Sequence, residues 1–300
     1  MCYNEGSMSE VLVVGNVTKD VYLRLDNRLN KFEVDSVGVT WLDLAFNGSS
    51  HQFYARHSVF GGAAVSLEVL SRFGLSTKIV GSNIGFLGGE LTETAEVIPE
   101  TYRYILCQDD NIAYFSPSRI VAAKWQAPSE PVKWIFIDRS TCVSREMADE
   151  ILNYLESVPE TKLAFFVCKR TSLASGETHM QRLKERANLL FTDVVDELCD
   201  RTKCVCVAKD FIQFGEKRVE WSLQERQDLM THLTTDSIIA ASILGAVVLG
   251  KTEELGLLLA KANVENANLD GTINLNRLEE MIVGENYRVG KVEKQEESND

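Results

Sequence analysis

The chain has 300 residues, of which 44 are acidic and 31 basic, so its formal net charge at pH 7 is −13. With 45% hydrophobic and 25% charged residues, the composition is typical of a folded globular protein and excludes disordered and collagen-like classes. The excess of acid weighs against a nucleic-acid partner, because phosphate backbones are bound through clustered Lys and Arg. The chain has no signal-peptide pattern and no apolar stretch that could cross a bilayer, so we expect no membrane association and a cytoplasmic location.

Seven cysteines are scattered along the chain. An odd and scattered set is typical of reduced thiols in a cytosolic protein, so we expect these cysteines to be unpaired.

Short apolar runs alternate with segments of helical period along most of the chain. The expected strands are residues 11–14, 78–80, 134–137, 163–167, 189–191 and 204–207. The expected helices are residues 63–73, 145–156, 180–186, 194–199, 237–249 and 253–263. Near-continuous apolar strands separated by helices predict an α/β fold with a parallel sheet covered on both faces, and such sheets bind ligands at the carboxyl ends of their strands.

Two stretches break this alternation. Residues 21–60 contain strand-like pieces with no helical segment between them, and residues 102–115 are typical of a hairpin. We predict a small β-sheet lid, from about residues 18–60 and 101–116, on a single α/β domain of residues 10–285. The remaining ends, 1–9 and 286–300, lack apolar periodicity and are expected to be a flexible leader and a flexible acidic tail.

Residues 245–252, G-A-V-V-L-G-K-T, fit the phosphate-binding pattern G-x-x-x-x-G-K-[S/T]. Such a loop must follow a strand, whereas the residues from Ser237 onward have helical spacing. We therefore expect a buried helix that ends near Gly250, followed by a surface turn. A P-loop nucleotidase remains a poor alternative.

A further candidate lies just before that helix, in the run H-L-T-T-D that ends at Asp236. Thr and Asp before an apolar helical run predict an N-cap. A helix N-terminus also presents free N–H groups and a partial positive charge to a phosphoryl group, and an adjacent carboxylate can accept a hydroxyl proton. The residues alone leave open whether this is only a helix start or a catalytic site.

The order of the other motifs favours the catalytic interpretation. A first strand with a glycine turn and an acid (11–20) precedes a paired-glycine turn and amphipathic helix (60–74), then I-V-G-S-N-I-G (79–85), A-N-L-L-F-T-D-V-V-D (187–196), the Asp236 helix and L-L-A-K-A-N (258–263). This succession resembles the PfkB or ribokinase-like family of carbohydrate and nucleoside kinases. The resemblance implies a three-layer α/β fold, with a central, mostly parallel sheet flanked by helices and a small β-sheet lid. It also implies ATP-dependent phosphorylation of a primary hydroxyl of a sugar or nucleoside.

The resemblance assigns roles to individual residues. It makes Asp236 the general base. It implies that the substrate is bound by Thr18, Asp20, Gly61, Gly62 and Ser66. It implies that ATP is bound by Asp193, Lys209, Thr234, Thr235 and Asn263, with Mg²⁺ held through water by Asp193 and Asp196. In related folds an exposed lid edge often pairs with a second subunit, which would give a homodimer.

The chain departs from the family pattern around the phosphoryl group. The family's G-A-G-D is L-T-T-D at 233–236, and its N-x-x-E is D-V-V-D at 193–196. If left-handed backbone is needed, a Thr in place of Gly costs about 1–2 kcal/mol. The family's nucleotide-facing glycine loop is also replaced, by A-K-D-F at 208–211. The alternative is therefore a catalytically weak or inactive relative that binds a sugar or nucleoside as a sensor or interaction module.

Overall fold

The computed structural model describes residues 10–25, 53–81, 102–108, 111–115, 124–141, 143–167, 178–193, 204–208, 211–220, 230–266 and 290–291. Within these ranges the structure contains no helix with the length and apolar character that crossing a membrane requires.

A nine-stranded sheet forms the centre of the molecule, in the order β13-β12-β11-β10-β9-β8-β7-β1-β4. Its parallel part consists of β1 (Val11–Val14), β4 (Thr77–Val80), β7 (Trp134–Ile137), β8 (Lys162–Val167), β9 (Leu189–Thr192) and β10 (Cys204–Val207). Three strands extend it in antiparallel fashion: β11 (Phe211–Phe214), β12 (Lys217–Glu220) and β13 (Gly290–Lys291). The predicted mostly parallel sheet is thus confirmed.

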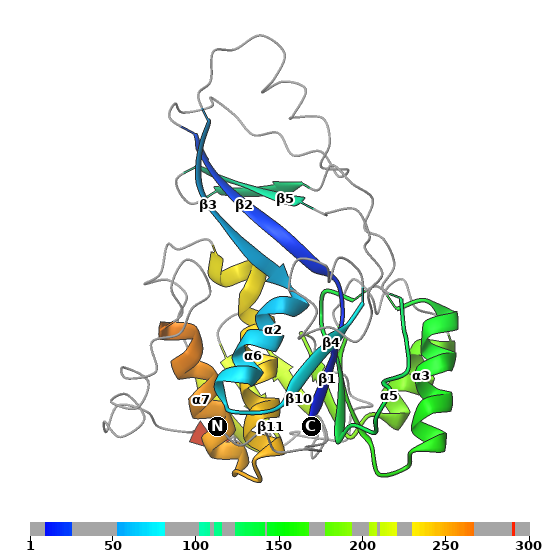
Figure 1. Cartoon of the computed structure of the whole chain (residues 1–300). Helices are drawn as coiled ribbons and strands as arrows, with labels where there is room; N and C mark the ends of the chain where they lie inside the picture. The colour runs from blue at the N-terminus through cyan, green and yellow to red at the C-terminus, as the bar shows by residue number, and fades with distance from the viewer. Residues whose placement is uncertain are drawn as a thin grey trace, which may run out of the picture.

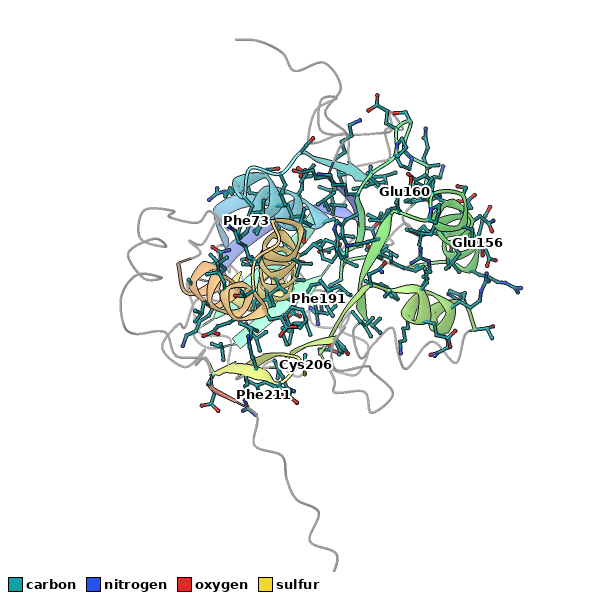
Figure 2. All side chains as sticks on the ribbon, turned by 90° about the horizontal axis from the view of Figure 1, so that it is seen from below. Phe73, Glu156, Glu160, Phe191, Cys206 and Phe211 are labelled. Carbon is teal, nitrogen blue, oxygen red and sulfur yellow. The ribbon has the colours of Figure 1, made fainter. Side chains whose placement is uncertain are left out.

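Helices cover both faces of this sheet (Figure 1). One face carries α2 (Ala63–Arg72), α6 (Met230–Val248) and α7 (Glu253–Asn266), and the other carries α3 (Arg145–Ser157) and α5 (Thr178–Arg186). Successive side chains of a strand point to opposite faces, so Val11 packs with the first group of helices and Leu12 with the second. Figure 2 shows side chains filling both layers, with Phe73 on the α2 side and Glu156 on the α3 side. The predicted three-layer fold is confirmed.

A second, four-stranded sheet has the order β3-β2-β5-β6. Its strands are β2 (Val17–Leu25), β3 (Phe53–Gly62), β5 (Tyr102–Gln108) and β6 (Asn111–Phe115). β2 pairs with β3 antiparallel and with β5 parallel, and β5 and β6 form the predicted hairpin. This sheet projects from the body above the end of β1, because β2 continues directly from that strand (Figure 1). The expected small β-sheet is therefore present.

The start of α6 differs from the sequence-based prediction. The sequence predicts a helix from Ser237 after an N-cap cluster, but α6 begins at Met230. Thr and Asp have helix propensities below that of Ala by less than about 0.7 kcal/mol, so tertiary context can override their preference for caps. In an α-helix that begins at Met230, the N–H groups of Thr234, Thr235 and Asp236 bond to carbonyls four residues earlier. They are therefore not the free N–H groups that the sequence predicts at the N-terminus of this helix.

The end of α6 excludes the P-loop alternative. The Gly250 N–H donates to the carbonyl of Val247 at 3.0 Å, and the Lys251 N–H donates to that of Ala246 at 2.9 Å, with Gly250 at φ +67°. This pair of bonds is a Schellman helix end. The Thr252 Oγ1 then accepts from the Leu255 N–H at 3.2 Å and caps α7. The expected helix end and surface turn are confirmed, because residues 245–248 are helical, so a helix rather than a strand leads into Gly250.

Two further sequence-based expectations have different outcomes. Cys204 is disulfide-bonded, so the expectation that all cysteines are reduced is wrong at this residue, whereas Cys206 is free and buried. The helix predicted at 194–199 lies outside the described residues.

Candidate functional site

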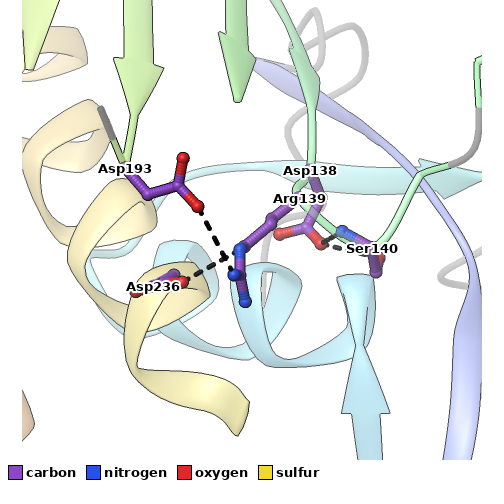
Figure 3. Close-up of polar contacts among 5 residues, drawn as sticks. All are labelled: Asp138, Arg139, Ser140, Asp193 and Asp236. Carbon is purple, nitrogen blue, oxygen red and sulfur yellow. Dashed lines mark hydrogen bonds and ion pairs between the residues drawn. The ribbon is translucent and has the colours of Figure 1, made fainter. Parts of the chain in front are cut away.

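Charged side chains gather at the carboxyl ends of the parallel strands (Figure 3). Asp138 and Arg139 follow β7, and Asp193 follows β9. α6 brings Asp236 to the same place, where an ion pair joins it to Arg139. In α/β sheets this edge is where ligands bind, so the cluster is the candidate functional site.

Asp236 is the carboxylate with the most perturbed environment in this cluster. Its side chain is only 18% exposed, and its Oδ2 lies 2.9 Å from the Nε of Arg139. Burial raises the pKa of Asp236 from 3.8 to about 6; Asp193 and Asp138 add to the rise, and Arg139 opposes it. At neutral pH the group is therefore mostly ionised yet able to take up a proton, as a general base requires.

Arg139 lies between two of the acids. Its Nη2 is 3.8 Å from the Oδ2 of Asp193, while its Nε faces Asp236, and its Cζ lies 6.0 Å from the centroid of the Phe166 ring. The Nε–H makes no hydrogen bond despite the short distance to Asp236, so this contact is an ion pair without good donor alignment. Sequence reasoning missed Arg139. The available signal was a charged pair directly after the apolar run 134–137.

Asp138 fixes the loop that carries Arg139. The Asp138 side chain is 1% exposed, and its Oδ2 accepts from the Ser66 Oγ at 2.6 Å. Its Oδ1 accepts from the N–H and the Oγ of Ser140, at 2.8 and 2.6 Å. The Thr141 Oγ1 donates to the carbonyl of Val14 at 2.8 Å. The carboxylate of Asp138 thus accepts from Ser66 and twice from Ser140, so it is satisfied although buried and serves as an anchor for the loop.

Ser66 lies beneath the site. It is 0% exposed, and its hydroxyl is directed at Asp138. The prediction that Ser66 binds the substrate is not tested by this arrangement, but its present contact supports the Arg139 loop from within the core.

The paired glycines join the small sheet to α2. Gly62 is the N-cap of α2 at φ +65°, and a Cβ there would lie 2.2 Å from the carbonyl oxygen of Asn16. That carbonyl accepts the Ala63 N–H at 2.9 Å. Only glycine permits this conformation and this close approach. Gly61 pairs with Thr18 on β2, and Asp20 pairs with Val59, so the structure brings the predicted substrate-binding segments together.

Three more of the predicted residues, Thr234, Thr235 and Asn263, lie on α6 and α7. Thr235 is 3% exposed and its Oγ1 has no hydrogen-bond partner. Asn263 is 2% exposed, and its Nδ2 donates to the Ser242 Oγ at 2.6 Å, which ties α7 to α6. Thr234 lies within α6. Lys209 and Asp196 fall outside the described residues.

Of the two carboxylates that the sequence predicts to hold Mg²⁺, Asp193 lies within the described residues. Asp193 is 24% exposed at the end of β9 and suits a water-mediated contact to Mg²⁺, which keeps several waters and binds few carboxylates in phosphate sites. Among the residues that the structure describes, no group of three His, Cys, Asp or Glu side chains could hold a metal by itself.

Solved structures share this architecture. The nucleoside kinase of Methanocaldococcus jannaschii, a member of the ribokinase family, is 13% identical with a TM-score of 0.59, over 92% of this chain and 100% of that one. Arabidopsis thaliana ribokinase, in complex with ribose and ATP, is 13% identical with a TM-score of 0.61, over 93% and 100%. Ribokinase from Cryptococcus neoformans, in complex with ADP, is 12% identical with a TM-score of 0.55, over 91% and 99%.

No family model matches the sequence, and no curated protein matches it. At these low identities the structural likeness shows the fold, and the fold is ribokinase-like.

Proposed function

We propose that the protein is an ATP-dependent phosphotransferase that phosphorylates a primary hydroxyl of a sugar or nucleoside. The observation that carries this proposal is Asp236, a carboxylate with its pKa raised to about 6 at the carboxyl edge of a ribokinase-like sheet. The small β-sheet projects from the same edge, where it can cover an acceptor (Figure 1).

In the proposed reaction the acceptor hydroxyl loses its proton to Asp236 as its oxygen bonds to the γ-phosphorus of ATP. A base with a pKa near 6 combines ionisation at neutral pH with useful proton affinity. Mg²⁺ would neutralise charge on the phosphates, and Asp193, with Asp196, is proposed to hold it through water. Thr18, Asp20, Gly61 and Gly62 are proposed to receive the acceptor.

The structure changes one of the proposed contacts to ATP. Lys209 and Asp193 remain the proposed contacts to ATP. Asn263 is suited to a supporting role, because it is buried and its amide is bonded to Ser242.

The second candidate function is a sugar- or nucleoside-binding protein with little or no turnover. The early start of α6 favours it, because the amides of residues 234–236 are used inside the helix rather than left for a phosphoryl group.

A coupled ADP-release screen over sugars and nucleosides, with Mg²⁺ and ATP, separates the two functions. We expect acceptor-dependent ADP release by the unmodified protein and a loss of roughly 100-fold or more in Asp236→Asn, in line with the usual size of general-base catalysis. Asp149→Asn is the matched control, because Asp149 is a partly exposed acid that pairs with Arg182 away from the site. Acceptor binding that raises the melting temperature without any turnover contradicts the kinase and supports the binding protein.

A further inference from the structure

Among the described residues, the backbone amides at Asp236 are not free to supply the positive charge that a phosphoryl group beside it requires. The N–H groups of Thr234, Thr235 and Asp236 lie within α6. Among the described residues, the cation in ion-pair contact with Asp236 is Arg139. Transfer of a phosphoryl group depends mainly on positioning and charge stabilisation, so the guanidinium is the group to consider.

Arg139 has the position that such a role demands. It contacts Asp236, the proposed base, at 2.9 Å and Asp193, on the proposed metal and nucleotide side, at 3.8 Å (Figure 3). A phosphoryl group in transfer lies between the nucleotide and the base. The guanidinium therefore occupies the region that this group would cross.

The donors of Arg139 are not saturated. The contact to Asp193 is long, the Nε–H makes no hydrogen bond, and the side chain is 34% exposed. A guanidinium carries five N–H donors in a planar fork that fits two oxygens of a phosphate. Arg139 can therefore replace its contact with a poorly aligned carboxylate by hydrogen bonds to the oxygens of a phosphoryl group.

The backbone of Arg139 is held on both sides. Asp138 before it is anchored by Ser66 and Ser140, and the Thr141 N–H donates to the Asp138 carbonyl at 3.0 Å. A change of partner then needs only rotation of the side chain, without movement of the loop. Such a preorganised support is what electrostatic stabilisation requires.

We propose that Arg139 leaves the carboxylate of Asp236 and binds the γ-phosphoryl oxygens of ATP during transfer, in place of the helix amides. This inference rests on the proposed function. In the step, the bond between the acceptor oxygen and the γ-phosphorus forms, the bond to the β–γ bridging oxygen breaks, and ADP leaves with that electron pair. The hydroxyl proton passes to Asp236, and Arg139 stays protonated throughout.

Equilibrium binding of AMP-PNP and of ADP, each with Mg²⁺, tests the contact without any acceptor. The unmodified full chain is expected to bind AMP-PNP more tightly than ADP. Arg139→Gln is expected to lose roughly ten-fold or more in affinity for AMP-PNP and to keep its affinity for ADP within about two-fold, since hydrogen bonds to charged groups are of that strength. Asp236→Asn frees Arg139 and removes a like charge, so it is expected to bind AMP-PNP more tightly than the unmodified chain does.

The controls distinguish a phosphoryl contact from a merely structural ion pair. Arg182→Gln removes a partly exposed arginine from α5 and is expected to change neither affinity. In the Arg139→Gln, Asp236→Asn double variant, the gain from Asp236→Asn should disappear. If Arg139 only positions Asp236, Arg139→Gln will shift the pH profile of turnover and leave the preference for AMP-PNP intact, which overturns the inference.

The inference and the proposed function fail in different ways. Acceptor-dependent turnover with an unchanged AMP-PNP preference in Arg139→Gln overturns the inference and keeps the kinase. Loss of that preference with no acceptor phosphorylated supports the phosphoryl contact and contradicts the kinase. If the unmodified chain binds neither nucleotide, both are wrong.

Discussion

Asp236 destabilises the folded chain at neutral pH, because burial disfavours its ionised form. Below pH 3.8 the carboxyl is protonated in both the folded and the unfolded chain. Between pH 3.8 and about 6 the unfolded chain ionises first, so the free energy of unfolding falls as the pH rises, and above about 6 the full penalty applies. This pH dependence of stability is the reverse of that of the usual carboxylate. A group that lowers the stability of the folded chain is typical of functional sites, which are kept at the expense of stability.

Asp236→Asn is therefore expected to stabilise the protein at pH 7.5. The pKa rise from 3.8 to about 6 corresponds to roughly 3 kcal/mol. That rise already includes the attraction of Arg139, so we expect a net gain of up to about 3 kcal/mol. Urea unfolding at pH 7.5 and at pH 4 measures this gain, which should shrink at the lower pH.

Asp149→Asn is the control, because Asp149 is a partly exposed acid, 39% exposed, that pairs with Arg182 away from the buried cluster, so its replacement is not expected to stabilise the protein. A loss of stability in Asp236→Asn at pH 7.5 would mean that the ion pair to Arg139 outweighs the burial of the carboxylate.

At the scale of elements, the packing of α6 against α2 depends on a glycine. A Cβ on Gly245 would lie 2.9 Å from the Cδ2 of Phe73 and 3.1 Å from its Cγ, so the aromatic ring needs this space. We predict that Gly245→Ala destabilises the protein by about 1–3 kcal/mol, the usual result of adding a methyl group to a filled core. Chemical denaturation measures the change.

Gly256→Ala is the matched substitution in α7. Its Cβ would meet only ordinary contacts, at 3.5 Å or more, so the higher helix propensity of Ala should stabilise the chain by up to about 1 kcal/mol. A second test is Phe73→Leu, which should reduce the effect of Gly245→Ala. Equal effects of Gly245→Ala and Gly256→Ala would show that contact with Phe73 is unimportant.

The same elements show what the sequence could reveal. The strand at Val11–Val14 is predictable residue by residue, because a buried parallel strand is a continuous apolar run. The start of α6 is not, because its first turns, M-T-H-L-T-T-D, contain Thr and Asp, which favour caps, and local propensity is a weak guide that tertiary context can override.

The sequence predicts a residue of the candidate site where a motif contains it. It does not predict residues that come together only when distant segments of the chain fold against each other. The sequence made Asp236 a candidate because it precedes an apolar run of helical spacing, whereas the structure places it inside α6. Arg139 could not be found in this way, because its importance arises when β7 and α6, about a hundred residues apart, meet at one edge of the sheet. The role of Ser66 was likewise hidden, since its bond to Asp138 joins α2 to the β7 loop.

The strands that the structure describes form two sheets with different degrees of cover. In the nine-stranded sheet, β1 is paired on both sides, its residues are 0% exposed, and helices cover both faces. The small sheet has only four strands, with β3 and β6 at its edges, and it projects from the body (Figure 1). Local opening costs less where fewer buried contacts hold a segment, so the two sheets should differ in local stability.

Hydrogen exchange should therefore separate the sheets in the free protein. We predict that amides of β1, β7 and β8 exchange slowest, and that those of β5 and β6 exchange at least roughly ten-fold faster. If the small sheet is a lid, AMP-PNP with the acceptor found by the ADP-release screen should slow exchange in β2, β3 and β5 and leave β8 unchanged. Equal protection of both sheets in the free protein would contradict the first prediction, and a small sheet that does not respond to the two ligands would contradict the lid.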